Sequence, residues 1–372
     1  MKVACLADIH LGYRAYPATI EGRNAREVDI EKAFTDAVQQ VVKTDPDLVT
    51  FAGDIFHHPR VSNHAKLAFT QGIEHILEAT SAHVVAVQGN HDTARTAAVL
   101  SPIYFAGRGP RVHVCDEYRV FDANGIKVTA IPACGCPTRR VLLERSEVCV
   151  IHAPIKGKGI PSFYAGDDAL KAGSLSEIFG VVHAGDYHEP RYILPNVFYS
   201  GATAKTTSNI WGEKDSKRGW VFAELKEDGW GLNHVKVYGR PILDLQEEGA
   251  RGVNTALERV LSSQASYSHL NDRIGQSLPK RYIVRVRADN VSREDVDWKL
   301  VKKVKKEVLR LQLEIALPVA KDGIDIATPQ PLSEHAEQYF QGLRPLVNHY
   351  ARKWADPHYK GFTPTRERME VV

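Results

Sequence analysis

The sequence predicts an α/β protein of layered sheets and helices, followed by a smaller α+β unit. Five short apolar segments end directly in polar residues, and segments suited to helices, at 27–43 and 64–79, lie between several of them. A second alternation of helix and strand begins near residue 240. Because continuous apolar runs of this length are typical of strands buried on both faces, we expect them to form the interior of the layers.

The composition is that of an ordinary globular protein. The chain has 372 residues, of which 43% are apolar and 25% charged, and its net charge is only +3. The longest apolar runs are far shorter than the ~20 residues that cross a membrane. Met1 leads directly into a strand-like segment without a signal-peptide pattern, so we expect a cytoplasmic protein. The five cysteines have no paired spacing and predict neither a disulfide framework nor a zinc ribbon.

The polar residues after the five apolar segments are all types that can bind a metal ion. The segments are VACLA before Asp8 and His10, LVTFAG before Asp54, VVAVQG before Asn90, His91 and Asp92, VCVI before His152, and FGVVHAG before Asp186 and His188. Ligands of such sheets gather at the carboxyl ends of the strands, so these residues could share one site. Each motif alone has a plainer interpretation as a turn, a helix cap or a buried histidine. The combination in this order favours a site.

The chemistry of these side chains indicates which ions they would bind. The set contains carboxylates, imidazoles and one amide but no thiolate, which suits manganese, iron or zinc better than calcium or copper(I). Seven candidate ligands are too many for one ion, and a carboxylate can bridge two. We therefore expect a two-metal hydrolytic centre, in which the ions activate a water molecule and hold a phosphate oxygen.

These motifs resemble the ordered motifs of the calcineurin-like metallophosphoesterases. The stretches DIHLGYR at 8–14 and GDIFH at 53–57 make the chain similar to the SbcD-type nuclease subunit of the SbcCD family, which acts in DNA double-strand-break repair. The resemblance covers residues 1–240 strongly and 240–318 in outline. It implies a layered β-sandwich fold with a smaller cap domain and two divalent ions, expected to be Mn²⁺. The implied activity is that of a DNA exonuclease with endonuclease capacity.

The resemblance also implies a role for each candidate residue. Asp8, His10 and His188 would bind one ion, Asn90, His152 and Asp186 the other, and Asp54 would bridge them. His91 would stabilise the transition state or protonate the leaving oxygen, with Asp92 orienting it, and His57 rather than His58 would position the phosphodiester. At Asp186 the family usually has histidine. We expect Asp186 to remain a ligand and to shift the metal preference toward manganese or magnesium.

Three domains are expected: a metallophosphoesterase domain at 1–239, an α+β cap at 240–318, and a helical tail at 319–372. Gly239-Arg240-Pro241 marks the first boundary. In the cap we expect helices at 251–264 and 293–310 and strands at 281–287 and 311–316, with Ser292 and Asp295 starting the second helix in the manner of a capping box. Val296, Leu300, Val304 and Val308 form an apolar stripe on that helix, and its basic residues are Lys299, Lys302, Lys303, Lys306 and Arg310.

The basic residues of the cap have two interpretations. From Lys280 to Arg310 the chain contains eleven Lys or Arg and five Asp or Glu. Such a helix face could be merely solvated, but beside a nuclease-like domain it could contact the DNA backbone.

Further partners are expected from the resemblance. In the tail, Leu346, Tyr350 and Trp354 recur every four residues; the stripe could pack on its own domain or dock onto an SMC-like ATPase of the SbcC type. We also expect a homodimer, through the faces near 64–79 and 95–106. Two other functions remain open: a calcineurin-like phosphodiesterase or phosphatase acting on a nucleotide or other small phosphoester, and a non-catalytic DNA-binding subunit with a decayed site.

Overall fold

A computed structural model describes residues 1–94, 96, 99–107, 109–133, 144–161, 169–207, 209–266 and 282–316. Met1–Leu317 forms one compact unit. The predicted helical tail at 319–372 lies outside the described residues. The boundary expected near residue 239 falls within this unit and stays a prediction.

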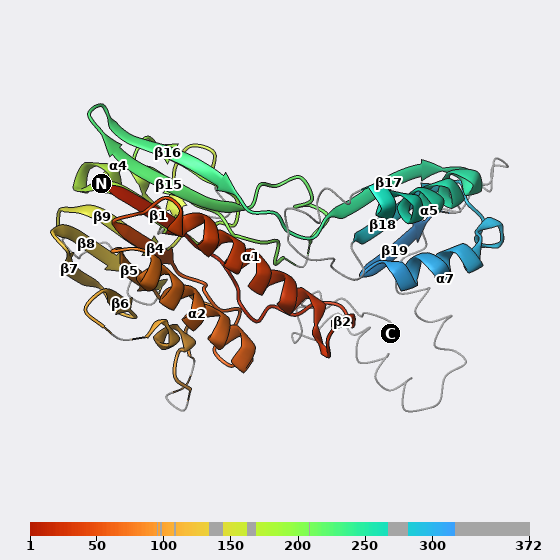
Figure 1. Ribbon diagram of the computed structural model, residues 1–372. Coiled ribbons are helices and arrows are strands. Elements are labelled where there is room, and N and C mark those ends of the chain that lie inside the picture. The colour runs from red at the N-terminus through yellow and green to blue at the C-terminus, as the bar shows by residue number, and fades with distance from the viewer. Residues whose placement is uncertain are drawn as a thin grey trace, which may run out of the picture. The chain divides into compact units, whose positions relative to one another are not determined.

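Two six-stranded sheets form the larger part of the molecule (Figure 1), and most neighbouring strands within them run parallel. The first sheet has the order β16 (Gly229–Lys236), β15 (Gly219–Lys226), β1 (Lys2–Leu6), β4 (Leu48–Ala52), β5 (His83–Val87), β6 (Val112–Cys115). The second has the order β13 (Arg191–Leu194), β14 (Val197–Tyr199), β12 (Phe179–Gly185), β9 (Ser146–His152), β8 (Ile126–Ile131), β7 (Arg119–Ala123). The five predicted apolar strands are β1, β4, β5, β9 and β12.

The two sheets pack face to face through an apolar layer. Val3, Val85, Val148, Val181 and Phe198 are among its buried side chains and come from both sheets. The predicted layered sandwich is therefore confirmed.

Helices cover the outer faces of the sandwich. On the first sheet, α1 (Ala25–Val42) and α2 (Asn63–Ala79) lie side by side (Figure 1) and bury their apolar faces against β1, β4 and β5. Asn24 and Ser62 cap their amino ends through side-chain oxygens. The second sheet is covered by α4 (Ala172–Ile178). The short elements are β2 (Thr19–Ile20), β3 (Arg23–Asn24), β10 (Ile155–Lys156), β11 (Leu170–Lys171) and the 3₁₀-helix η1 (Pro102–Ala106).

The cap is a parallel three-stranded sheet with helices on one face. The strand order is β17 (Ile242–Glu248), β18 (Ile283–Asp289), β19 (Arg310–Ile315), and α5 (Gly249–Ser266) and α7 (Trp298–Glu307) cover it. β17 was not predicted from the sequence, because its second half, LQEE, contains only one apolar residue.

The second cap helix is shorter than predicted. A 3₁₀ turn, η3 (Arg293–Asp295), precedes α7, and Asp297 is the N-cap, whose side chain accepts hydrogen bonds from the backbone of Lys299 and Leu300. Ser292 makes no side-chain cap, so the predicted start was wrong. Within α7 the buried valines are Val301 and Val304. Among the described helices, none is long and apolar enough to span a membrane.

Candidate metal centre

The candidate ligands come together where the carboxyl ends of strands from the two sheets meet. β1, β4 and β5 approach from the first sheet, and β9 and β12 from the second. The strands touch closely here: a side chain on Gly185 would place its Cβ 1.9 Å from the backbone oxygen of Ala52, so only glycine fits. The site therefore lies at the junction of two sheets, not in the crevice of one.

The residues expected at the first ion form one cluster. Ligand atoms of Asp8, His10 and His188 all lie within 4.8 Å of one another. The Nε2 atoms of the two histidines are 3.1 Å apart. All three come from loops after β1 and β12, and Asp8 and His10 are buried.

The residues expected at the second ion surround the imidazole of His152. Its Nε2 lies 2.8 Å from Asn90 Oδ1 and 3.8 Å from Asp186 Oδ1. Its Nδ1 donates a hydrogen bond to the backbone oxygen of Ala52, at 2.8 Å. With Nδ1 committed to that bond, Nε2 is the nitrogen that faces the other ligands, as in many metal sites.

Asp54 lies between the two clusters. Its Oδ2 is 3.8 Å from His10 Nε2, and its Oδ1 is 3.5 Å from His152 Nε2. The backbone N–H of His91 donates to the same Oδ1, at 2.9 Å. One carboxylate thus presents a different oxygen to each cluster, which is the geometry that a bridging ligand needs.

The electrostatics of the centre fit a cation. Burial raises the pKa of Asp8 well above its usual value and also raises the pKa of Asp54. Burial lowers the pKa of His10 well below its usual value and that of His188 to about 4, so both imidazoles are neutral at pH 7. Buried carboxylates with raised pKa values, next to the neutral imidazoles of His10 and His188, are a donor set that a divalent ion would stabilise.

The backbone around the ligands is strained. Asp8, His10, Asp54 and Asp186 have positive φ angles of 50°, 54°, 49° and 100°. Non-glycine residues rarely adopt this conformation, which costs about 1–3 kcal/mol and tends to cluster at functional sites. Holding these side chains in place therefore lowers the stability of the fold.

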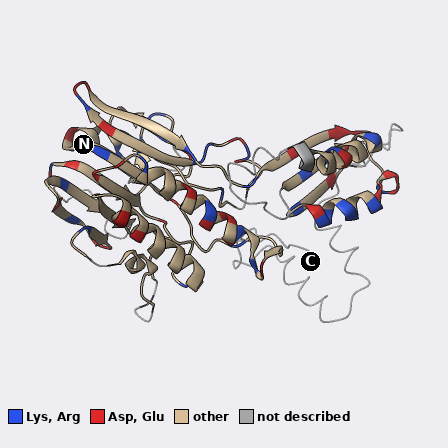
Figure 2. Ribbon diagram, in the orientation of Figure 1, with Lys and Arg blue, Asp and Glu red and all other residues tan. Residues whose placement is uncertain are grey.

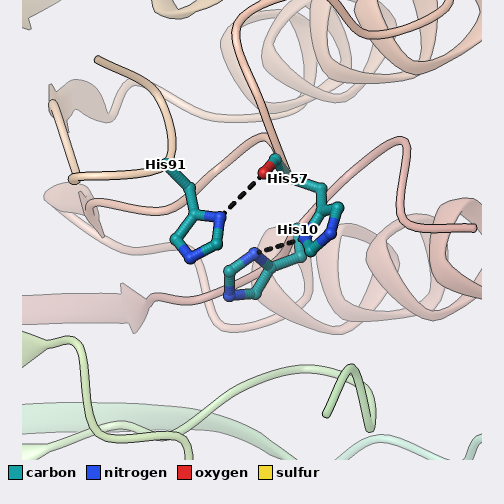
Figure 3. Close-up of side chains that lie close together, drawn as sticks. All are labelled: His10, His57 and His91. Carbon is teal, nitrogen blue, oxygen red and sulfur yellow. Dashed lines mark hydrogen bonds between the residues drawn. The ribbon is translucent and has the colours of Figure 1, made fainter. Parts of the chain in front are cut away.

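Two further histidines lie beside His10 (Figure 3). His91 Nδ1 donates to the backbone oxygen of His57, at 2.8 Å, and the two rings stack with centroids 5.3 Å apart. His57 Nδ1 is 3.4 Å from His10 Nδ1. Burial lowers the pKa of His57 to about 4, so this ring is neutral at pH 7. His58 makes no such contact with His10, although both His57 and His58 line a cavity of about 390 Å³ next to Asn90 and His91.

Asp92 does not orient His91, and that expectation was wrong. Its carboxylate accepts hydrogen bonds from the backbone N–H groups of Ile55, Phe56 and Gly89, at 3.2, 2.7 and 2.9 Å. It therefore holds the loops after β4 and β5 together, and the carbonyl of His57 orients His91. Burial raises the pKa of Asp92 to about 6. All three partners are backbone N–H groups, and two of them lie 36 residues or more away along the chain. Sequence spacing therefore cannot reveal them.

The basic residues of the cap are only partly where they were expected. Lys299, Lys302, Lys303 and Lys306 are exposed on α7, where Figure 2 shows Lys and Arg gathered. Arg310 is not on the helix but begins β19, and its guanidinium lies 4.5 Å from the ring centre of Tyr16. Tyr13 had no predicted role, yet its ring meets His57 edge-on, with centroids 5.0 Å apart. Its position inside DIHLGYR was the available signal.

Comparisons with known proteins show what the chain is similar to. A family model described as Calcineurin-like phosphoesterase matches residues 1–157. The DNA double-strand break repair protein Mre11 of Aeropyrum pernix is 32% identical over 302 residues, which are 70% of this chain and 68% of that protein. The protein of the same name from Methanopyrus kandleri is 26% identical over 125 residues, 30% of this chain and 26% of that protein. Among solved structures, the match to the Pseudomonas putida nuclease MPE covers 58% of this chain and 81% of that one, at 15% identity and a TM-score of 0.28.

Proposed function

This chain belongs to the family of the DNA double-strand break repair protein Mre11, and from that membership we propose that it is a two-metal-dependent DNA nuclease. We expect it to hydrolyse phosphodiester bonds at DNA ends, as an exonuclease with endonuclease capacity. The observation that carries the proposal is the convergence of five strand ends on Asp54, which presents one oxygen to each ligand cluster.

We propose that Asp8, His10 and His188 hold one divalent ion, that Asn90, His152 and Asp186 hold the other, and that Asp54 bridges them. When bound, such ions lower the pKa of a water molecule and stabilise charge on the phosphoryl oxygens. The distances around His10 and His152 support this division. Mn²⁺ is the ion we expect, because the set contains three carboxylates and no thiolate.

The histidines beside the metal centre would handle the substrate. Because the Nδ1–H of His91 is held by the His57 carbonyl, its Nε2 remains to contact the phosphate, and it would give a proton to the leaving oxygen from the doubly protonated ring. The His57 ring stacks against His91 and carries no charge at pH 7, so we assign it the positioning of the phosphodiester.

A comparison of two substrates tests the proposal. In the presence of Mn²⁺, the protein should degrade linear duplex DNA much faster than bis(p-nitrophenyl) phosphate at equal concentrations of phosphodiester bonds. His91→Ala should lower the rate on DNA by about 100-fold or more, the range typical of a lost proton donor. His83→Ala is the matched control, because His83 lies at the amino end of β5, the end opposite to Asn90. Preference for the small diester would favour a calcineurin-like phosphodiesterase of another substrate class.

We propose that the exposed lysines of α7 contact the DNA backbone. The exposed lysines of this short helix include Lys299, Lys302, Lys303 and Lys306. Glu307 is the one acidic residue within the helix that offsets their positive charge. The two basic residues in the last turn also suit the negative end of the helix dipole. The alternative is a solvated face without DNA contacts, and a salt titration separates the two.

We also propose a homodimer that uses α2 and η1. Four of the seven large apolar side chains that are exposed in the described residues lie on α2, on η1 or just before η1: Leu67, Leu100, Tyr104 and Phe105. The two elements are in contact, since Thr70 Oγ1 donates to the backbone oxygen of Phe105, at 2.8 Å. A cluster of exposed apolar groups of this kind is typical of an interaction surface.

The SbcC-type ATPase partner is a proposal that rests on the sequence resemblance alone. Its expected docking segment contains Leu346, Tyr350 and Trp354 and lies outside the described residues. Co-purification of the full chain with a candidate ATPase, compared with a Leu346→Glu/Trp354→Ala variant, tests it. Equal capture of both proteins would contradict the assigned segment.

A further inference from the structure

Three buried polar side chains form a chain of hydrogen bonds across the apolar layer between the sheets. Thr50 of β4 meets His183 of β12, with Oγ1 2.8 Å from Nδ1. On the other side, His183 Nε2 is 3.0 Å from Oγ of Ser200, the residue after β14. All three residues are fully buried, and the neighbouring side chains of this layer are apolar.

Both ring nitrogens of His183 make hydrogen bonds, and the ring is neutral. Burial lowers the pKa of His183 to about 3, so the ring has one N–H donor and one lone pair at any pH near neutrality. It donates to one hydroxyl and accepts from the other. An apolar side chain in its place would leave both hydroxyls without this partner, and burial makes such a loss costly.

Each member of this chain lies a few residues from a candidate ligand. Thr50 precedes the bridging Asp54 by four residues, and His183 precedes Asp186 by three. Ser200 is followed by the segment that holds the His188 loop, because the backbone N–H of Ala202 donates to the backbone oxygen of His188, at 2.9 Å. The three hydrogen-bonded residues thus connect the segments that carry ligands of both ions.

Close packing at Gly185 also prevents the two sheets from approaching each other more closely. Gly185 touches the backbone of Ala52 so closely that β4 and β12 can come no nearer at that point. The hydrogen bond between Thr50 and His183 opposes their separation. A metal site tolerates errors of only about 0.2 Å in its ligand distances, so a spacing held from both directions matters there.

We propose that His183 is a positioning residue of the metal centre, which holds β4 and β12 at the spacing that lets Asp54, Asp186 and His188 bind the two ions together. The inference rests on the two-ion centre proposed above and adds to it a residue that touches neither ion nor substrate. We therefore expect metal affinity to fall when these hydrogen bonds are lost, and not merely when the core is destabilised.

Direct titration of the metal-free protein with Mn²⁺ in a calorimeter tests this role without any nuclease assay. His183→Leu should weaken Mn²⁺ binding about tenfold, the lower end of what the loss of a residue behind a metal ligand costs. His183→Gln, which retains a donor and an acceptor, should recover most of the affinity. Val181→Ala is the matched control, because Val181 is buried in the same strand and the same apolar layer but makes no polar link. It should lower the melting temperature and leave Mn²⁺ affinity unchanged.

Two results would overturn the proposal: wild-type affinity in His183→Leu, or an equal loss of affinity in Val181→Ala at a matched fall in melting temperature. If His183→Leu does not fold, Thr50→Val takes its place with the same expectation, since it removes only the hydroxyl partner. A wild-type protein that binds Mn²⁺ but leaves DNA uncut would count against the nuclease function, and the comparison of variants would still decide the role of His183.

Discussion

Asp186 is the residue at which this chain departs from the histidine usual in the resembled family. Its Oδ1 lies 3.8 Å from His152 Nε2, and its backbone N–H donates to both oxygens of Asp8, at 3.0 and 3.2 Å. Asp186 therefore contacts a candidate ligand of the first ion through its backbone N–H and lies beside a candidate ligand of the second ion through its side chain. As a third carboxylate it adds negative charge, which favours harder ions.

Asp186→His should shift the metal preference from manganese and magnesium toward zinc. We expect the Mn²⁺ concentration for half-maximal activity to rise several-fold, because an imidazole brings no negative charge to the second ion. Activity measured across a Mn²⁺, Mg²⁺ and Zn²⁺ series checks this. Asp228→His, in the exposed turn between β15 and β16, is the control. An unchanged preference in Asp186→His would remove Asp186 from the ligand set.

His183 should also make the fold sensitive to acid. Its pKa is about 3 in the folded protein against about 6.5 when unfolded, so below pH 6.5 the unfolded chain binds a proton that the folded chain does not. Stability from this residue is complete above pH 6.5 and is lost as the pH falls. Between pH 6.5 and 5.5 the wild type should lose about 1 kcal/mol more unfolding free energy than His183→Gln, by urea denaturation. Parallel curves for the two proteins would contradict the assignment.

The candidate ligands could be predicted from the sequence because each one directly follows a buried apolar strand. The structure places Asp8, His10, Asp54, Asn90, His152, Asp186 and His188 together, and it brings His57 and His91 beside them. The role of Asp92 and the link from Thr50 through His183 to Ser200 could not be predicted. Their partners are backbone groups or lie far away in sequence, and only the packing of two sheets brings them together.

Among the elements, the buried ones were the most predictable. The helices expected at 27–43 and 64–79 correspond to Ala25–Val42 and Asn63–Ala79, because each has an apolar face against the sheet and a side-chain cap. The start of α7 was misplaced, since Asp297 rather than Ser292 satisfies the free N–H groups of its first turn. Arg310 was assigned to the helix face because the helix was expected to run to residue 310, whereas α7 ends at Glu307 and Arg310 begins β19.

Reversing the charge on α7 tests whether this element binds DNA. A Lys302→Glu/Lys303→Glu/Lys306→Glu variant should bind duplex DNA more weakly and with a flatter salt dependence. Each lost phosphate contact should reduce the slope of log K against log salt by about 0.9. Fluorescence anisotropy at several salt concentrations measures both quantities. Reversal of Lys2, Lys43 and Lys226, which lie outside the cap, is the control; equal effects of both sets would indicate a non-specific charge effect.

For the molecule as a whole, the expected assembly rests on the apolar surface of α2 and η1. A Leu67→Glu/Phe105→Glu variant should be monomeric, because charges would replace side chains that are 53% and 43% exposed in one chain. Size-exclusion chromatography with light scattering gives the mass. Leu225→Glu alters a side chain of similar exposure on β15 and should leave the mass unchanged. A wild-type protein that is already monomeric would refute the proposed dimer.

In the proposed mechanism, Asp54 bridges two divalent ions that together cleave DNA. The most direct measurement determines the Mn²⁺ stoichiometry and the rate of hydrolysis of linear duplex DNA on the same preparations of wild type and Asp54→Asn. The wild type should bind two ions per chain and degrade the DNA. Asp54→Asn should bind fewer than two ions and lose nearly all activity while remaining folded. Full activity of Asp54→Asn, or wild-type cleavage with a single bound ion, would contradict the account.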